Sequence, residues 1–214
     1  RIKSKDAIGV DLGSTALKIV QLKGAGGLWK VHRANVLPLP NAGPDVAGPE
    51  RRVQAISLLK EYVAKQKDSI SKNAVFSVSG NSVIVRFVKF PKMSRDDLSK
   101  MIVIEAEPYI PFAIPEVNID FNILGDTVEE GQKKMETILV AAKKEIINGR
   151  LEIIQQSGMT PSLIDVDAFA LQNAYELNVG ANAKETALLV HIGAFVTTMT
   201  IIESGVPKVV RDVF

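Results

Sequence analysis

The stretch that decides the fold is AIGVDLGSTALKIVQLK, residues 7–23, because a similar stretch, ALLVHIGAFVTTMTIIE, occurs at residues 187–203. The two align without a gap at one constant spacing, with Gly13 matching Gly193. Each reads as an apolar strand, a turn that contains glycine and a second strand rich in β-branched residues. Backbone N–H groups at such turns bind phosphate. The repeat therefore predicts two phosphate-binding loops that face each other across a cleft.

The bulk composition is that of a folded protein. The chain has 214 residues, of which 46% are hydrophobic and 23% charged, so it can bury a substantial core. A net charge of +2 gives no electrostatic reason to expect nucleic acid binding. With no cysteine, disulfides and thiolate metal sites are excluded. The longest apolar stretch, 187–202, contains His191 and three threonines, which make it a poor membrane span.

The first half of the chain alternates strands with helical segments. Periodicity and turn residues predict strands at 6–11, 15–23 and 28–37, a loop at 38–49, and a helix at 50–68. Two further strands follow at 74–79 and 83–90, with Gly80-Asn81 read as the turn of a hairpin between them.

The second half returns to the opening pattern. Ser94 begins a helix with a capping-box start, and Pro108 ends it near Glu105. The elements expected after it are strands near 117–124 and 135–142, a helix at 143–157 stopped by Gly158, a strand at 162–166, a helix at 168–178, and strands at 186–192, 196–203 and 206–211. The first three-stranded unit is followed by a loop and a helix, whereas the second is followed directly by Phe214. We therefore expect a piece of a longer, internally duplicated protein.

The first loop has the chemistry of a phosphate site. Gly13 lets the backbone approach a phosphate, and Ser14 and Thr15 add hydroxyl donors. Asp11 can hold a hydrated Mg²⁺. Lys18 can neutralise phosphate charge if the turn brings it to the side of Asp11. The alternative is an ordinary hairpin whose turn is solvated.

The second loop differs at one position, where His191 matches Asp11. Gly193 again permits close approach, and Thr197 and Thr198 can donate hydroxyl groups. An imidazole cannot replace a carboxylate beside Mg²⁺, because Mg²⁺ prefers oxygen ligands. If His191 faces the cleft, it weakens metal binding or water activation. The alternative is a core histidine bonded to a backbone carbonyl.

Several segments resemble the actin-like ATPases, which include actin, heat-shock 70 chaperones, sugar kinases and the division protein FtsA. The chain is most similar to the PilM family of type IV pilus assembly, over nearly its whole length. The segments that carry the resemblance are GVDLGSTALKIVQL, FPKMSRDDLSKMIVIEAEPYIPF, LIDVDAFALQNAYE and LLVHIGAFVTTMTIIESGVPKVVRDVF. The family usually has Asp where this chain has His191, and its adenosine-binding segment lies further along than Phe214.

The resemblance implies an α/β, actin-like (ribonuclease-H-like) duplicated fold. A first lobe would span 1–84 with 168–180 returning to it, an FtsA-type inserted subdomain 85–167, and an incomplete second lobe 181–214. ATP or ADP with Mg²⁺ would be held by residues of both loops, with Asp11 reaching the metal through water. Those residues are Asp11, Gly13, Ser14, Thr15, Lys18, Gly193, Ala194 and Thr197.

The family's partner is the cytoplasmic tail of PilN, an inner-membrane protein, docked as an extended peptide near the inserted subdomain. The resemblance suggests a lining of Val85, Phe87, Phe90, Met101, Ile104, Tyr109, Ile110, Pro111 and Phe112. From the residues alone, 109–112 is an apolar segment interrupted by proline, which packs either as a core loop or as part of a peptide groove.

The leading hypothesis is a cytoplasmic scaffold, recruited by its partners to the inner face of the inner membrane. The resemblance also allows a pilus motor ATPase as partner and a homo-oligomer. Two alternatives stay open. One is an active ATPase or phosphotransferase of the sugar-kinase or heat-shock 70 class; Asp165 and Asp167 are its candidate carboxylates, although Asp167 would more simply cap the helix from Ala168. The other is an FtsA-like division tether, which needs a terminal amphipathic helix.

Overall fold

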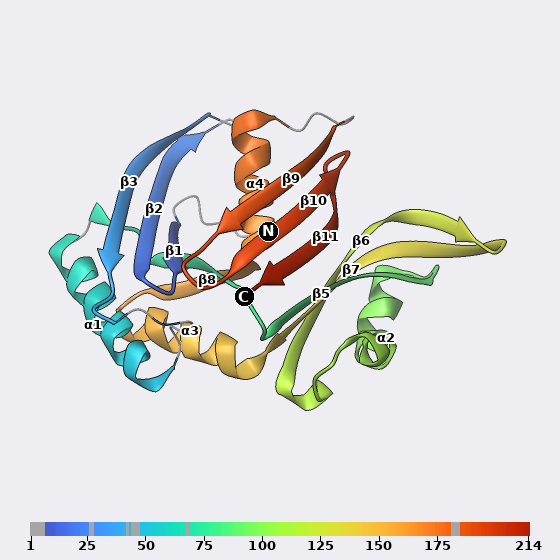
Figure 1. The fold of residues 1–214 in the computed structure, drawn as a ribbon, viewed down its shortest axis with the longest axis horizontal. Coiled ribbons are helices and arrows are strands. Elements are labelled where there is room, and N and C mark those ends of the chain that lie inside the picture. The colour runs from blue at the N-terminus through green and yellow to red at the C-terminus, as the bar shows by residue number, and fades with distance from the viewer. Residues whose placement is uncertain (1–6, 26–27, 42, 44–47, 67–68, 181–184) are drawn as a thin grey trace.

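A computed structural model describes residues 7–25, 28–41, 43, 48–66, 69–180 and 185–214. Its strands form three separate sheets, one of five strands and two of three. Figure 1 shows the five-stranded sheet at the left, the β9–β11 sheet in the middle and the β5–β7–β6 sheet at the right. None of the helices in these ranges is long and apolar enough to cross a membrane.

The five-stranded sheet contains the first copy of the repeat. Its strands are β1 (Ile8–Leu12), β2 (Ala16–Ala25), β3 (Leu28–Pro38), β4 (Asn73–Val78) and β8 (Thr160–Val166), in the order β3-β2-β1-β4-β8. Apolar side chains alternate along β1 and β2, so one face is apolar. The helices α1 (Pro49–Gln66) and α3 (Lys144–Gln156) cover that face. Their shared core includes Ile8, Leu17, Ile19, Leu59, Ile153 and Ile154.

A second sheet is inserted between β4 and α3. It consists of β5 (Val83–Pro91), β6 (Val117–Glu129) and β7 (Gln132–Lys143), in the order β5-β7-β6. The helix α2 (Arg95–Ala106) packs on one of its faces through Leu98, Ile102 and Ala106. The Asp97 backbone N–H donates to the Ser94 hydroxyl (3.1 Å), so the predicted cap is confirmed. Two short 3₁₀ helices, η2 (Glu107–Tyr109) and η3 (Ile114–Glu116), connect α2 to β6.

The structure corrects two expectations about the strands. Gly80 does form a turn, with a φ of 82° and a bond from the Val83 N–H to its carbonyl. However, β4 and β5 do not pair, because the chain leaves the first sheet at this turn and enters the inserted one. Conversely, β6 and β7 extend well beyond their predicted ends to a tight turn at Glu130 and Gly131, both at positive φ. Polar side chains on both strands had hidden this extension.

The sheets also divide the chain differently from the ranges expected for its parts. The inserted sheet ends at Lys143. The next two elements, α3 and β8, belong with the first lobe, since α3 packs in its core and β8 pairs in parallel with β4. The α4 helix (Asp167–Val179) follows β8 directly. The part of the chain that leaves the first lobe is therefore shorter than 85–167.

The second copy of the repeat folds in the same register as the first. It forms β9 (Thr186–Ile192), β10 (Thr197–Glu203) and β11 (Val206–Val213). Asp11 lies opposite Lys18 in the first hairpin, and the matching pair in the second is His191 and Thr198. A register shift follows Gln21 in one copy and the matching Ile201 in the other. The predicted internal repeat is thus confirmed at the level of strand pairing.

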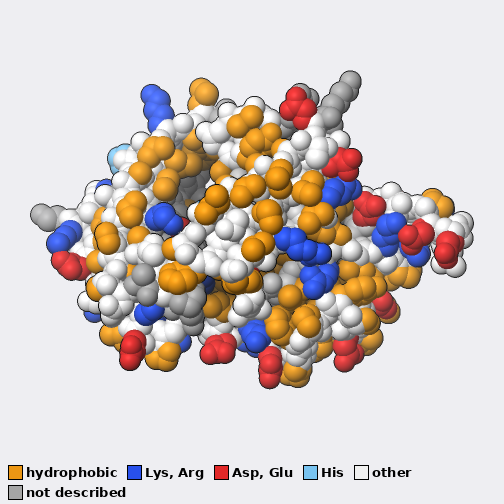
Figure 2. All heavy atoms as spheres, viewed as in Figure 1, with side chains coloured by type: hydrophobic (Ala, Val, Ile, Leu, Met, Phe, Trp, Pro, Cys, Tyr) orange, Lys and Arg blue, Asp and Glu red, His pale blue; other side chains and the backbone are white. Residues whose placement is uncertain are grey.

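The two copies bury opposite faces of this shared hairpin. In β2 after Ala16, the buried residues are Leu17, Ile19 and Gln21, and the first two pack in the core with α1 and α3. In β10 they are those of Thr198, Thr200 and Ile202, which match the more exposed Lys18, Val20 and Leu22. This second face lies toward α4 and β5, since Val210, opposite Thr200, packs with residues of both elements. On the other face, hydrophobic side chains remain accessible, and many appear over β9–β11 in Figure 2.

Candidate functional site

The first loop places Asp11 and Lys18 side by side. They are directly opposite each other in the β1–β2 ladder, and Lys18 Nζ donates to Asp11 Oδ2 at 2.7 Å. The turn does therefore bring the lysine to the side of the carboxylate. Glycine is required at position 13, because a Cβ there would lie 2.8 Å from the carbonyl oxygen of Ala16. Because position 13 has no side chain, a ligand can approach the backbone of this tight loop closely.

The back of the loop is held by the segment that leads into α1. The Leu39 N–H donates to the Thr15 carbonyl (2.9 Å), and the Gly43 N–H to the Ser14 carbonyl (3.1 Å). The Arg51 guanidinium donates to the carbonyl oxygens of Ser14 and Gly43, and to that of Asn41 at 3.1 Å. These bonds occupy the loop carbonyls from behind. Preorganisation of this kind is what a phosphate site needs.

The second loop is built on the same plan. A Cβ on Gly193 would lie 2.7 Å from the Val196 carbonyl oxygen, which also accepts a bond from the Gly193 N–H (2.9 Å). His191 is exposed, so the alternative of a buried core histidine is excluded. The Thr198 hydroxyl donates to Asp212 Oδ1 (2.7 Å), and Asp212 Oδ2 accepts the Gly80 N–H (2.9 Å). Asp212 thus links the second loop to the turn that enters the inserted sheet.

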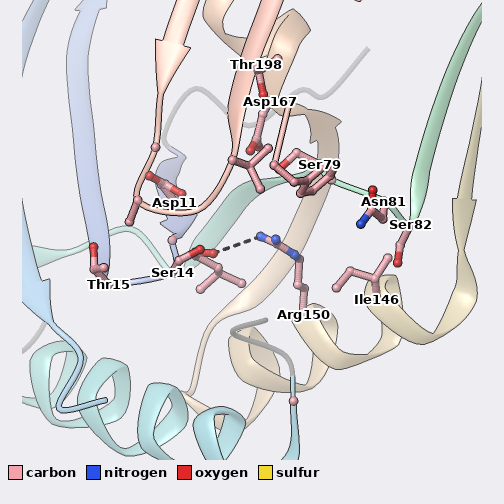
Figure 3. Close-up of a pocket in the computed structure, with 18 of the residues that line it drawn as sticks. Asp11, Ser14, Thr15, Ser79, Asn81, Ser82, Ile146, Arg150, Asp167 and Thr198 are labelled. Carbon is pink, nitrogen blue, oxygen red and sulfur yellow. Dashed lines mark hydrogen bonds between the residues drawn. The ribbon is translucent and has the colours of Figure 1, made fainter. Parts of the chain in front are cut away.

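The two loops face one cleft, with a volume of about 450 Å³ (Figure 3). Seven of the eight predicted nucleotide-site residues line it, and these are Asp11, Gly13, Ser14, Thr15, Lys18, Gly193 and Ala194. Thr197 is not among the lining residues, and its neighbour Thr198 takes this place. The reason is the alternation of β10, which turns consecutive side chains to opposite faces.

The cleft also contains residues that no sequence motif predicted. The turn from Ser79 to Ser82 forms one wall, and Arg150 of α3 lies between this turn and the first loop (Figure 3). Arg150 donates to the Ser77 carbonyl at 2.8 Å, so it also fixes the end of β4. No motif marked these residues, because they come from elements far apart in the sequence. The one available signal was the glycine at position 80, which was assigned to a hairpin.

Asp167 enters this cleft from the start of α4. The expectation that it caps the helix is wrong, because Asp167 is the first helical residue and the N-cap, Val166, makes no side-chain capping bond. Its carboxylate is therefore available to a ligand in the cleft, together with that of Asp11. In the described ranges no group of three or more His, Asp or Glu side chains could hold a metal ion alone. The residues present fit a hydrated Mg²⁺ that arrives bound to phosphates, which needs only one or two carboxylates.

Comparison with known proteins identifies the family. Residues 9–212 match the family described as type IV pilus assembly protein PilM. The chain belongs to the PilM family. It is similar to a chain of the "PilM-PilN type IV pilus biogenesis complex", with a TM-score of 0.83, 27% identity, and coverage of 97% of this chain and 61% of that one. The chain thus spans about three fifths of the length of that relative.

Two more distant structures share the fold of this PilM-family chain. One is the cytoplasmic domain of EpsL, an inner-membrane component of the Vibrio cholerae type II secretion system (TM-score 0.57, 14% identity, 97% of this chain and 71% of that one). The other is MreB5 of Spiroplasma citri bound to ADP (TM-score 0.50, 12% identity, 98% and 52%). At these identities the likeness shows an actin-like ATPase fold and no more.

The residues suggested for peptide binding lie in different places. Val85 is buried beside Val166 and Ala168, and Phe87 follows it on the same face of β5. Phe90, Ile110 and the half-buried Phe112 belong to the core under α2. The exposed members are Phe87, Met101, Ile104, Tyr109 and Pro111. Tyr109 touches Phe90 edge-on, with 6.2 Å between ring centroids. The structure therefore leaves only a surface around α2 and η2, with Phe87 apart from it on the other face.

A groove lies on the opposite face of the inserted sheet, with a volume of about 500 Å³. One wall is β6, where the five consecutive residues Asn118–Asn122 all line it. The facing wall is formed by the end of β8, by Phe169 and Asn173 of α4, and by the β10–β11 turn. None of the nine suggested residues lines this groove. The PilM-family chain thus has two candidate surfaces for an extended peptide.

Proposed function

We propose that this chain is part of a cytoplasmic, actin-like scaffold of type IV pilus assembly or a related secretion system. In this proposal it binds the extended cytoplasmic tail of a PilN-like inner-membrane protein, and is recruited to the membrane through that partner. Support comes from the family match and from the likeness to a PilM–PilN complex at 27% identity. The inserted sheet would correspond to the FtsA-type subdomain, and Mg²⁺ with ATP or ADP would be a switching ligand in the cleft.

The single observation that carries the partner proposal is the groove along β6. This strand pairs only with β7, so its outer edge is unpaired in the described sheet. The groove runs along β6 from Asn118 to Asn122 and extends over the adjoining face of β7 at Ile138 and Val140. An open edge beside apolar side chains suits an added strand, whose backbone gives affinity and whose alternate side chains give specificity.

The test is peptide binding measured by fluorescence anisotropy, using the labelled cytoplasmic tail of a PilN-like protein. Asn122→Trp fills the groove from an exposed position and should weaken binding at least tenfold. The matched control is Gln132→Trp, which adds the same ring at an exposed position outside the groove. Tyr109→Ala tests the surface around α2. Loss of binding in this variant alone would place the peptide there and refute the groove.

The nucleotide proposal rests on the paired glycine loops of the cleft. We expect Mg²⁺-dependent binding of ATP or ADP by calorimetry on the full-length protein, and loss of that binding in Asp11→Asn. If calorimetry detects no binding, or if Asp11→Asn binds as the parent does, the nucleotide proposal is refuted and the scaffold has no nucleotide switch at this site.

An active ATPase is the second candidate, and the observation in its favour is the carboxylate of Asp167 in the cleft. Against efficient hydrolysis stands His191, which is exposed at the position matching Asp11. His191→Asp should therefore raise the hydrolysis rate if the missing carboxylate limits it. Equal rates in the parent and the variant would show that this position does not control the reaction.

A further inference from the structure

The groove along β6 is lined by acidic side chains. Among the residues that the structure describes, its lining includes two carboxylates, those of Asp120 and Asp165, and no lysine or arginine. The remaining polar groups are amides, from asparagines such as Asn122 and Asn173 and from Gln172. Apolar side chains such as Leu124, Val140 and Phe169 complete the surface. A segment that fits such a groove must be largely aliphatic and must tolerate two acids.

Of the two acids, Asp165 has the greater need of a positively charged partner, because it is partly buried at the end of β8. Its Oδ1 accepts the Val166 N–H at 2.8 Å. Among the described residues it makes no ion pair with any lysine or arginine. Burial raises the pKa of this carboxyl above its usual value, a backbone hydrogen bond from Val166 opposes the shift, and the charge of Asp167 adds to it. An ionised carboxylate in this position lacks a compensating charge.

We propose that the groove selects an extended segment that carries one lysine or arginine between aliphatic residues, with the cation placed against Asp165. The inference rests on the proposed function, because it names the chemistry of the segment that the β6 edge would bind. The cation supplies the charge that Asp165 lacks among the described residues, and Asp120 adds a second attraction from the opposite wall. The aliphatic neighbours occupy the apolar surface, and the amides of the lining bond the peptide backbone. A neutral or acidic segment of the same shape would leave Asp165 uncompensated, so charge here provides selectivity.

The experiment has two stages, and the first identifies the ligand without assuming it. A library of random ten-residue peptides displayed on phage is panned against the chain. The same library is panned against Asp165→Asn, which keeps the shape and removes the charge, and against Asp96→Asn. Asp96 is an exposed acid on α2, outside the groove, so its variant carries the same change in net charge. We expect enriched peptides with one lysine or arginine flanked by aliphatic residues, from the parent and from Asp96→Asn only.

The second stage measures the charge directly. The best peptide is synthesised with its cationic residue as arginine and as citrulline, which has nearly the same shape and no charge. Arginine should bind the parent about tenfold or more tightly than citrulline, a ratio that corresponds to about 1.4 kcal/mol. In Asp165→Asn the ratio of the two affinities should fall towards one, whereas in Asp96→Asn it should equal that of the parent. A smaller fall in Asp120→Asn would assign that acid the secondary role.

The outcomes distinguish failure of the charge selection at Asp165 from failure of peptide binding in the groove. Enriched peptides without a cation, or a citrulline ratio that Asp165→Asn leaves unchanged, would overturn the charge selection while leaving the groove as a binding site. If Asn122→Trp does not weaken binding of the enriched peptides, they bind elsewhere, and both the charge selection and the groove as a binding site are overturned. No enrichment from any arm would also overturn both. Circular dichroism melting of each variant checks that a loss of binding is not a loss of fold.

Discussion

Asp212 links the second loop to the turn at Gly80, and its removal gives the most direct test of how the two are connected. One carboxylate oxygen accepts the Thr198 hydroxyl of the second loop at 2.7 Å, and the other accepts the Gly80 N–H at 2.9 Å. Thr198 is only 5% exposed, so its hydroxyl has little access to water. Hydrogen bonds to a charged group contribute about 1.5–3 kcal/mol each. Water can replace the carboxylate at the half-buried Gly80, so Asp212→Ala should cost about 2–4 kcal/mol of unfolding free energy.

The components of this cost can be separated by a double-mutant cycle. Thr198→Val removes one bond while keeping the shape of the side chain, and should cost about 1–2 kcal/mol. Because both single changes break the same bond, the double variant should be less destabilised than their sum by about 1–2 kcal/mol. Urea unfolding gives these values. Glu203→Ala, at an exposed position of the same hairpin, is the control and should change little.

The second measurement is local. Amide hydrogen exchange at Gly80 should be about tenfold to hundredfold faster in Asp212→Ala, because the amide loses its acceptor. Thr198→Val should leave that amide protected, since it does not touch the bond to Gly80. If exchange at Gly80 is equal in the parent and Asp212→Ala, the carboxylate does not hold the turn and the reasoning fails. A coupling energy near zero between Thr198 and Asp212 would show that the hydrogen bond between their side chains does not contribute to stability.

Three further predictions concern the inserted sheet and the first loop. Hydrogen bonds from Lys134, and to a smaller extent from Lys89, lower the pKa of the Glu129 carboxyl to about 2. Any stability that its ionised form contributes is present above the unfolded-state pKa of 4.5 and is lost as the pH falls from 4.5 toward 2. Lys134→Met should move the NMR titration midpoint of Glu129 upward. An unmoved midpoint would show that Lys134 is not the cause. Leu98→Ala empties a fully buried position under α2 and should cost about 2–5 kcal/mol in urea unfolding, whereas the neighbouring exposed Ser99→Ala should cost under about 0.5 kcal/mol; equal effects would refute this packing. Lys18→Met breaks an ion pair with Asp11 whose side chains are 49% and 46% exposed, so the unfolding free energy should change by less than about 1 kcal/mol, and a larger loss would mean that the pair supports the fold.

The strands and helices were largely predictable because their signals are local. The capping bond of Ser94, the repeat and the positions of nearly all elements follow from periodicity and turn residues. The partner of a strand is not a local property. The turn at Gly80 forms as expected, but nothing near it indicates that β5 pairs with β7, more than forty residues away, instead of with β4. The same limit explains the difference at α3 and β8, whose return to the first lobe depends on contacts with distant β4 and α1.

The candidate site divides along the same line. Residues that belong to a glycine loop were found, since the loop motif is contiguous in the sequence. Arg150 and Ser79 come from other elements and meet the loops only in the folded chain, where Asp167, predicted only as a carboxylate of the enzyme alternative, joins them. The groove along β6 was missed for a related reason. The apolar pattern of α2 and η2 drew attention to one face of the inserted sheet, while Asn118, Asp120 and Asn122 made the other face look like plain solvent-exposed surface.

The inversion of buried faces between the two copies has a consequence for their evolution. After a duplication, matching positions such as Ile19 and Met199, or Val20 and Thr200, came under opposite selective demands. A substitution that is tolerated in one hairpin is expected to be harmful at the matching position of the other. Gly13 and Gly193 keep the same role in both copies, because that role is fixed by the turn itself. Identity elsewhere does not mean a shared environment, since Val10 is buried whereas the identical Val190 is exposed.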